Sequence, residues 1–194
     1  PRGRRKHWEA WTLNRSYNFS AGPAALPVEA LEAARDELLN FEGSGMSIME
    51  QSHRGANYDR VHHEAIELLT ELLAVPETHQ VLLLQGGATQ QFATVPMNFL
   101  PEGGQAAYLV TGAWGEKAFK EAQVVAAGRG ARAVLANPGG ETGDFTSLPE
   151  QAEGLEGAAY LHVTSNETIH GVQYDSLYGS RYPDCGALPL VCDM

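Results

Sequence analysis

The spacing of hydrophobic residues along the chain changes near residue 80. Before that point, apolar residues recur every three or four positions, which predicts amphipathic helices that begin at Pro27 and at residue 58. After it, short apolar runs bounded by glycines alternate with helical patterns. Such runs are typical of strands that are covered on both faces in a mainly parallel sheet. The pattern therefore predicts an α/β protein with flanking helices.

The second part of the chain is predicted to alternate strands and helices. The expected strands cover residues 80–84, 106–111, 131–135, 158–164 and 188–193. The expected helices cover residues 58–73, 89–99 and 114–125, and residues 137–148 are expected to form a loop. Ligands of parallel sheets bind beyond the carboxyl ends of the strands. The residues that follow each strand are therefore the candidates for function.

A glycine turn follows the first predicted strand. Gly86 and Gly87 end the apolar run, and helical spacing starts again at Thr89. A turn of this kind presents free backbone N–H groups to an anion, and its glycines allow a ligand to approach closely. The turn lacks the lysine of a P-loop and the spacing of a dinucleotide-binding motif. It predicts a phosphate site, and glycines kept only for packing are the alternative.

Three other strand ends carry candidate chemistry. Trp114 opens a helix, where it could pack in the core or stack on a flat heteroaromatic ring. Polar residues at 165–168 follow another strand, and Asp193 follows the last one. Asp193 could cap a helix or face a cationic ring nitrogen. A phosphate site, a stacking ring and a buried acid are what pyridoxal 5'-phosphate (PLP) requires.

A lysine suited to a covalent link with PLP is missing from this set. The lysines are Lys6, Lys117 and Lys120. Lys6 lies in the basic lead, and the other two have the spacing of a solvated helix face.

Motifs that occur in register across residues 17–194 resemble the phosphoserine aminotransferases. They are Asn-Phe-Ser-Ala-Gly-Pro-Ala at 18–24, Ser-His-Arg-Gly at 52–55, Gly-Gly-Ala-Thr-Gln-Gln-Phe at 86–92, Thr-Gly-Ala-Trp at 111–114 and Asn-Glu-Thr-Ile at 166–169. The resemblance implies the large domain of a fold-type I, PLP-dependent aminotransferase, which works as a cytoplasmic homodimer. It implies transfer of an amino group between glutamate and 3-phosphohydroxypyruvate in serine biosynthesis, and the analogous step of pyridoxine biosynthesis.

The same resemblance implies roles for individual cofactor-binding residues. Ala88 and Thr89 are expected to contact the cofactor phosphate, and Trp114 is expected to stack on the pyridine ring. Thr168 is expected to bind near the phenolic oxygen, and Asp193 to pair with the ring nitrogen.

His53 and Arg54 match the substrate-binding pair of the family, which acts partly across the dimer interface. Arginine binds a carboxylate through two parallel hydrogen bonds, and histidine adds a donor for phosphate. This pair argues against two related readings, an alanine–glyoxylate-type aminotransferase and a cysteine desulfurase-like enzyme. A non-catalytic fragment of a PLP domain is the remaining alternative.

Some positions depart from the family pattern. The family continues past the buried aspartate to its Schiff-base lysine and a small C-terminal domain, whereas this sequence ends at Met194. The resemblance therefore covers the N-terminal half, no catalytic residue is assigned, and the isolated chain is expected to be inactive. His170 stands where the family usually has an acid. Residues 1–16 lie outside the pattern and are expected to be a disordered basic extension.

Composition excludes several other classes. The formal net charge is −11, which argues against nucleic acid as the main partner. No apolar stretch approaches the roughly 20 residues of a membrane span. Cys185 and Cys192 make neither a disulfide framework nor a zinc site, and no metal is expected at His62, His63 and Glu67.

Overall fold

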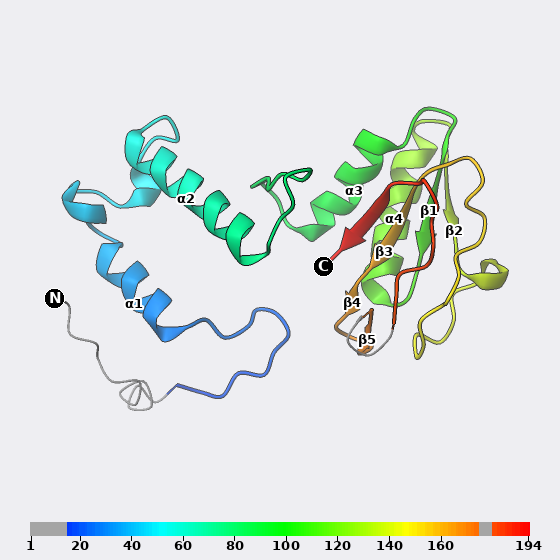
Figure 1. The fold of residues 1–194 in the computed structure, drawn as a ribbon, viewed down its shortest axis with the longest axis horizontal. Coiled ribbons are helices and arrows are strands. Elements are labelled where there is room, and N and C mark those ends of the chain that lie inside the picture. Colours follow the sequence, from blue (N-terminus) through cyan, green and yellow to red (C-terminus); the bar gives the residue numbers. More distant parts are fainter. Residues whose placement is uncertain (1–14, 175–179) are drawn as a thin grey trace. The chain divides into compact units, whose positions relative to one another are not determined.

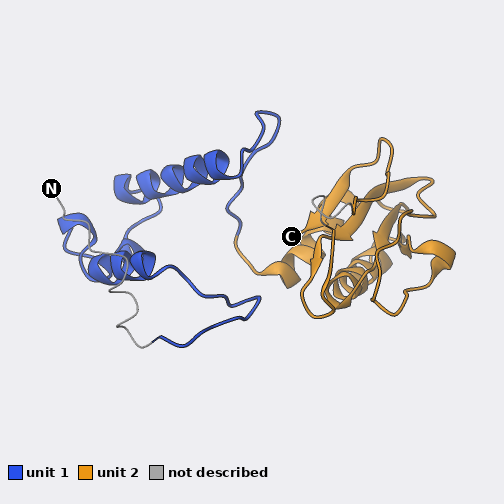
Figure 2. Ribbon diagram, turned by 60° about the horizontal axis from the view of Figure 1, so that its bottom comes forward, with its two compact units in different colours: residues 1–84 blue, residues 85–194 orange. Residues whose placement is uncertain are grey.

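The computed structural model describes residues 15–174 and 180–194. The expected disorder of residues 1–14 falls outside this described part. The chain divides into two compact units, residues 1–84 and residues 85–194 (Figure 2). Among the described residues, no helix combines the length and the apolar composition needed to cross a bilayer.

Over its described residues 15–84, the first unit contains two α-helices joined by short 3-10 turns. Its elements are α1 (Val28–Glu37), η2 (Phe41–Gly43), η3 (Ile48–Glu50) and α2 (Ala56–Leu72). Both predicted helices are confirmed, and Pro27 is the N-cap of α1, one position before the first helical residue. The buried side chain of Phe41 lies under the guanidinium of Arg60, which also pairs with Glu42.

The second unit is an α/β layer structure (Figure 1). Its elements are α3 (Ala88–Phe99), β1 (Gln105–Leu109), α4 (Ala113–Ala127), β2 (Arg132–Leu135), η4 (Pro138–Gly140), β3 (Ala158–Thr164), β4 (Asn166–Glu167), β5 (Val172–Gln173) and β6 (Leu190–Asp193). The main sheet has the order β2-β1-β3-β6, and each pair in it is parallel. The predicted parallel sheet is therefore confirmed, and β4 and β5 form a separate antiparallel hairpin.

The strand order creates a topological switch between β1 and β3. From β1 the chain passes through α4 to β2 on one side, whereas β3 and then β6 lie on the other side. In open parallel sheets, ligands bind at the carboxyl ends of strands where the connections diverge in this way. The ends of β1 and β3 are therefore where the fold presents a binding site.

Two apolar layers cover the sheet. On one face, α3 and α4 pack on Tyr108, Val110 and Tyr160, and the small residues Ala118 and Ala122 lie buried on α4. On the other face, Leu109, Leu161 and Val163 are covered by side chains from the loops before β3 and β6, namely Leu148, Leu155 and Leu188. The sheet is thus covered on both faces, as its apolar strands predict.

The prediction of a strand at residues 80–84 is wrong. These residues have no regular secondary structure, and Leu82, Leu83 and Leu84 are exposed. A strand exists only where its backbone hydrogen-bonds to a neighbouring strand. No described segment pairs with residues 80–84, which end at the boundary between the two units. Apolar composition alone therefore does not make this run a strand.

Buried His162 predicts an acid-sensitive core. Its ring stacks on Tyr108, with 4.9 Å between ring centroids, and burial lowers the pKa of His162 from 6.5 to about 4. The neutral form is favoured in the folded state, so stability is highest above pH 6.5 and falls as the pH drops towards 4. The loss can reach about 1.4 kcal/mol per pH unit. Between pH 4 and 8, the free energy of unfolding in urea should depend less strongly on pH in His162→Phe than in wild type. The exposed His79→Phe is the control, and equal slopes in all three proteins would contradict the prediction.

Candidate functional site

The loops after β1 and β3 bring Trp114 and Thr168 together. Trp114 lies in the first turn of α4, and Thr168 directly follows β4. The indole Nε1–H of Trp114 donates a hydrogen bond to Thr168 Oγ1 at 3.0 Å, although the two residues are 54 positions apart. Trp114 is half-buried and Thr168 is exposed. The switch point of the sheet is thus lined by an oriented aromatic ring.

One face of this indole carries a cation. Lys117, one turn along α4, places its Nζ 5.9 Å from the centre of the Trp114 ring. A cation over an aromatic face is attracted by the ring quadrupole. Lys120 instead pairs with Glu116 at 3.0 Å on an exposed face, as its spacing predicts.

Asp193 ends β6 on the face of the sheet that α4 covers. It lies in register with Thr164 of the neighbouring parallel strand β3. A Cβ added to Gly115 of α4 would lie 3.4 Å from Thr164 Oγ1, so Thr164 faces α4. Because registered residues of adjacent strands point to the same side, Asp193 shares that face.

The side chain of Asp193 is half-buried, and burial raises the pKa of its carboxyl group. Within the described residues, the carboxylate accepts no hydrogen bond. Its main-chain carbonyl accepts from Ser165 N at 2.8 Å and from Cys192 Sγ at 3.8 Å. A positively charged N–H group would therefore complete this site.

Two buried hydroxyl groups near the carboxyl ends of β1 and β3 have no hydrogen-bond partner in the part of the chain that the structure describes. Thr111 Oγ1 follows β1 and Thr164 Oγ1 ends β3, and both are buried without a hydrogen bond in the described structure. Buried polar atoms are nearly always hydrogen-bonded to protein, water or ligand. Thr164 Oγ1, on the α4 face, therefore suits a polar occupant there, whereas Thr111 lines the cavity described below.

Ala88 and Thr89 form the exposed first turn of α3. Gly87 is the N-cap of the helix, and Gly86 adopts a φ of +92°, which favours glycine. The first N–H groups of a helix have no partners within it, so they are free for an anion. One turn later, Phe92 is buried and meets the His162 ring of β3 edge-on, which anchors the helix on the sheet.

His53 and Arg54 lie in the loop between η3 and α2. Both side chains are exposed, and Arg54 N donates to Ser52 Oγ at 3.2 Å. The structure keeps this pair available for an anion. Both residues belong to the first unit, whereas the predicted cofactor residues belong to the second.

Sequence reasoning assigned no role to Glu167. Its side chain is fully buried, with Oε2 accepting from Trp114 N at 2.9 Å and Oε1 accepting from Gly115 N at 2.8 Å. A Cβ on Gly112 would lie 2.4 Å from the carboxyl carbon of Glu167. The glycines on either side of the Ala113-Trp114 pair were therefore the available signal, because they leave room for this side chain.

Gly112→Ala should displace Glu167 and destabilise the second unit. Overpacking of this kind costs about 1–3 kcal/mol of unfolding free energy. Gly143→Ala is the matched control, because an added Cβ there meets nothing within 4 Å. Urea unfolding of both variants tests the prediction, and equal stability of the two would contradict it.

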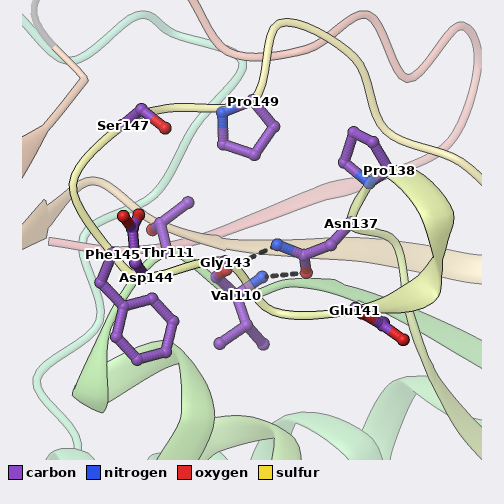
Figure 3. Close-up of a pocket in the computed structure, with 10 residues that line it drawn as sticks. All are labelled: Val110, Thr111, Asn137, Pro138, Glu141, Gly143, Asp144, Phe145, Ser147 and Pro149. Atoms are coloured by element: carbon purple, nitrogen blue, oxygen red, sulfur yellow. Dashed lines mark hydrogen bonds between the residues drawn. The ribbon is translucent and has the colours of Figure 1, made fainter.

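A separate cavity of about 240 Å³ opens beside β1 and β2 (Figure 3). Its floor is fixed by Asn137, whose side chain donates to Val110 O at 2.7 Å and accepts from Val110 N at 2.9 Å. Asp144, Phe145 and Thr111 also line it. None of the predicted cofactor or substrate residues does.

The chain is similar to several known proteins. The family described as "Aminotransferase class-V" matches residues 16–182. The phosphoserine aminotransferase of Lysinibacillus sphaericus is 49% identical over 182 residues, which is 93% of this chain and 47% of the relative. A solved phosphoserine aminotransferase from Bacillus circulans subsp. alkalophilus aligns with a TM-score of 0.76 and 46% identity, covering 93% of this chain and 47% of that one.

A PLP-bound phosphoserine aminotransferase from Trichomonas vaginalis also aligns, with a TM-score of 0.77 and 38% identity. It covers 93% of this chain and 48% of its own. The chain therefore spans about half the length of the curated relatives it matches. The family match, over residues 16–182, includes residues of both units. This chain belongs to the class-V aminotransferase family.

Proposed function

We propose that this chain is the cofactor-binding part of a phosphoserine aminotransferase. The proposed cofactor is PLP, and the proposed reaction transfers an amino group between glutamate and 3-phosphohydroxypyruvate. The observation that carries this proposal is the indole of Trp114, held by Thr168 at the switch point of the sheet, with Asp193 on the same face. The similarity to phosphoserine aminotransferases along 93% of the chain supports it.

The residues present fit PLP. The carboxylate of Asp193 accepts no hydrogen bond from the described residues. It suits a protonated ring nitrogen, because a cationic N–H would offset the burial that raises its pKa. The Thr164 hydroxyl, which faces α4 and has no hydrogen-bond partner among the described residues, also suits a polar occupant there. When bound, the cofactor supplies an electron sink for negative charge at the substrate α-carbon.

Each side chain then has a distinct task. Asp193 keeps the proton on the ring nitrogen, and Trp114 stacks on the ring and excludes water from one face. Thr168 orients both the indole and the ring edge, while the first turn of α3 at Ala88 and Thr89 binds the phosphate through free N–H groups.

The proposed substrates carry two anionic groups. His53 and Arg54 offer exposed donors for a phosphate and a carboxylate. We also propose that the protein acts in the cytoplasm as a homodimer, in which this loop serves the neighbouring site, and that it accepts the analogous intermediate of pyridoxine biosynthesis. The 194 residues alone are expected to show no turnover, because none of their lysines suits the covalent role.

PLP titration tests the proposal. Absorbance and calorimetry should show one saturable PLP site per chain. In the full-length protein, glutamate with 3-phosphohydroxypyruvate should turn over far faster than glutamate with glyoxylate. Absence of saturable binding, or a preference for glyoxylate, would refute it.

A further inference from the structure

We propose that the β4–β5 hairpin, residues 166–173, is a positioning clamp for the Trp114 indole, and that Glu167 is its positioning residue. The inference rests on the proposed function only for its expected effect on PLP affinity. The clamp itself is a feature of the chain's own contacts and can be tested without cofactor.

The hairpin holds the start of α4 through successive backbone groups. Glu167 accepts the N–H groups of Trp114 and Gly115, at 2.9 and 2.8 Å. His170 Nδ1 accepts the N–H group of Ala113 at 3.4 Å. Thr168 Oγ1 accepts the indole Nε1–H of Trp114. One short hairpin therefore fixes both the main chain and the side chain of the same tryptophan.

The position of Glu167 is itself fixed by the hairpin. Glu167 lies in register with Val172, and its carbonyl accepts from His170 N at 3.1 Å and from Gly171 N at 2.8 Å. Gly171 adopts a φ of +70°, which closes the turn. The carboxyl group therefore extends from a rigid turn, and a shift of the hairpin would move the start of α4 with it.

A buried carboxylate is destabilising unless it is fully hydrogen-bonded. Both oxygens of Glu167 are used, and they meet the N-terminal end of α4, where the helix dipole also favours negative charge. Of α1, α2, α3 and α4, none has a side-chain hydrogen bond from its own N-cap residue. Among the described residues, α4 alone of these helices receives carboxylate acceptors from a distant segment, and it is the helix that carries the indole. This points to positioning rather than routine capping.

Fluorescence tests the clamp directly. In a Trp8→Phe/Trp11→Phe background, Trp114 is the sole tryptophan. Glu167→Gln keeps the shape but turns an N–H donor towards a backbone N–H. We expect red-shifted Trp114 emission, stronger acrylamide quenching and an about tenfold weaker affinity for PLP. Glu153→Gln is the matched control, because Glu153 also accepts a backbone N–H, from Gly139 at 3.0 Å, but lies in an exposed loop. The Trp114 emission and the PLP affinity of Glu153→Gln should equal those of the wild-type protein.

A double-mutant cycle separates positioning from general stability. If Glu167 acts through the indole, Glu167→Gln should weaken PLP binding less than about twofold in a Trp114→Leu background. Equal losses in both backgrounds, or unchanged emission and affinity in a folded Glu167→Gln protein, would overturn the clamp. If Glu167→Gln does not fold, Thr168→Val decides instead, since unchanged Trp114 emission in that variant would also overturn it. If the wild type binds no PLP, the proposed function fails, while the emission shift still decides the clamp.

Discussion

Asp193→Asn is expected to lower the affinity for PLP about 100-fold, because a hydrogen bond between charged groups is replaced by a neutral one. The same substitution should raise the free energy of unfolding of the cofactor-free protein at pH 7. Burial raises the pKa of Asp193 in the folded state, so the folded protein loses stability as the pH rises through the titration of this group. A neutral side chain of the same shape removes that loss.

The prediction is specific because the affinity for PLP should fall while the free energy of unfolding should rise. Calorimetric titration with PLP gives the affinity, and urea unfolding without cofactor gives the stability. Asp184→Asn is the control, since Asp184 is exposed and its Oδ1 accepts from Gly186 N in a way that asparagine can preserve. It should change neither quantity. Wild-type affinity in Asp193→Asn would show that the carboxylate does not face the cofactor.

Trp114→Leu is expected to weaken PLP binding about 10- to 100-fold. The substitution removes the stacking surface and the hydrogen bond to Thr168 together. Trp114→Phe keeps an aromatic ring, so its affinity for PLP should fall only about threefold. Titration followed by absorbance gives both affinities.

Phe119→Leu is the control for a general loss of aromatic packing on α4. Its ring lies 5.8 Å from that of Tyr108 on the sheet-facing side of the helix. This variant should be less stable than wild type but should bind PLP normally once folded. If Phe119→Leu and Trp114→Leu weaken PLP binding by the same factor, the indole has no role in binding beyond general aromatic packing.

Local patterns predict most of the second unit. The runs that became β1, β2, β3 and β6 were recognisable because each is short, apolar and bounded by glycine. Residues 80–84 show the limit of that reasoning, because their apolar character is local but strand pairing depends on a distant neighbour. The β4–β5 hairpin was missed because strands of two residues are too short to show alternation.

The candidate site likewise has a part that the sequence predicts and a part that only the fold shows. The sequence places Trp114 and Asp193 at strand ends, but only the fold shows Trp114 hydrogen-bonded to Thr168 and Asp193 on the α4 face. Glu167 could not be found from spacing, because its partners are 52 and 53 positions away. The assignment of particular atoms of PLP to these residues stays a prediction from family resemblance.

Hydrogen exchange with and without PLP tests most directly whether separated segments converge on one ligand. We expect PLP to slow exchange together in residues 86–91, 112–116 and 165–169, and in the Cys192–Asp193 end of β6. Residues 138–147, around the separate cavity, should exchange at unchanged rates. Protection confined to one of these segments, or centred on residues 138–147, would show that the segments do not converge on PLP.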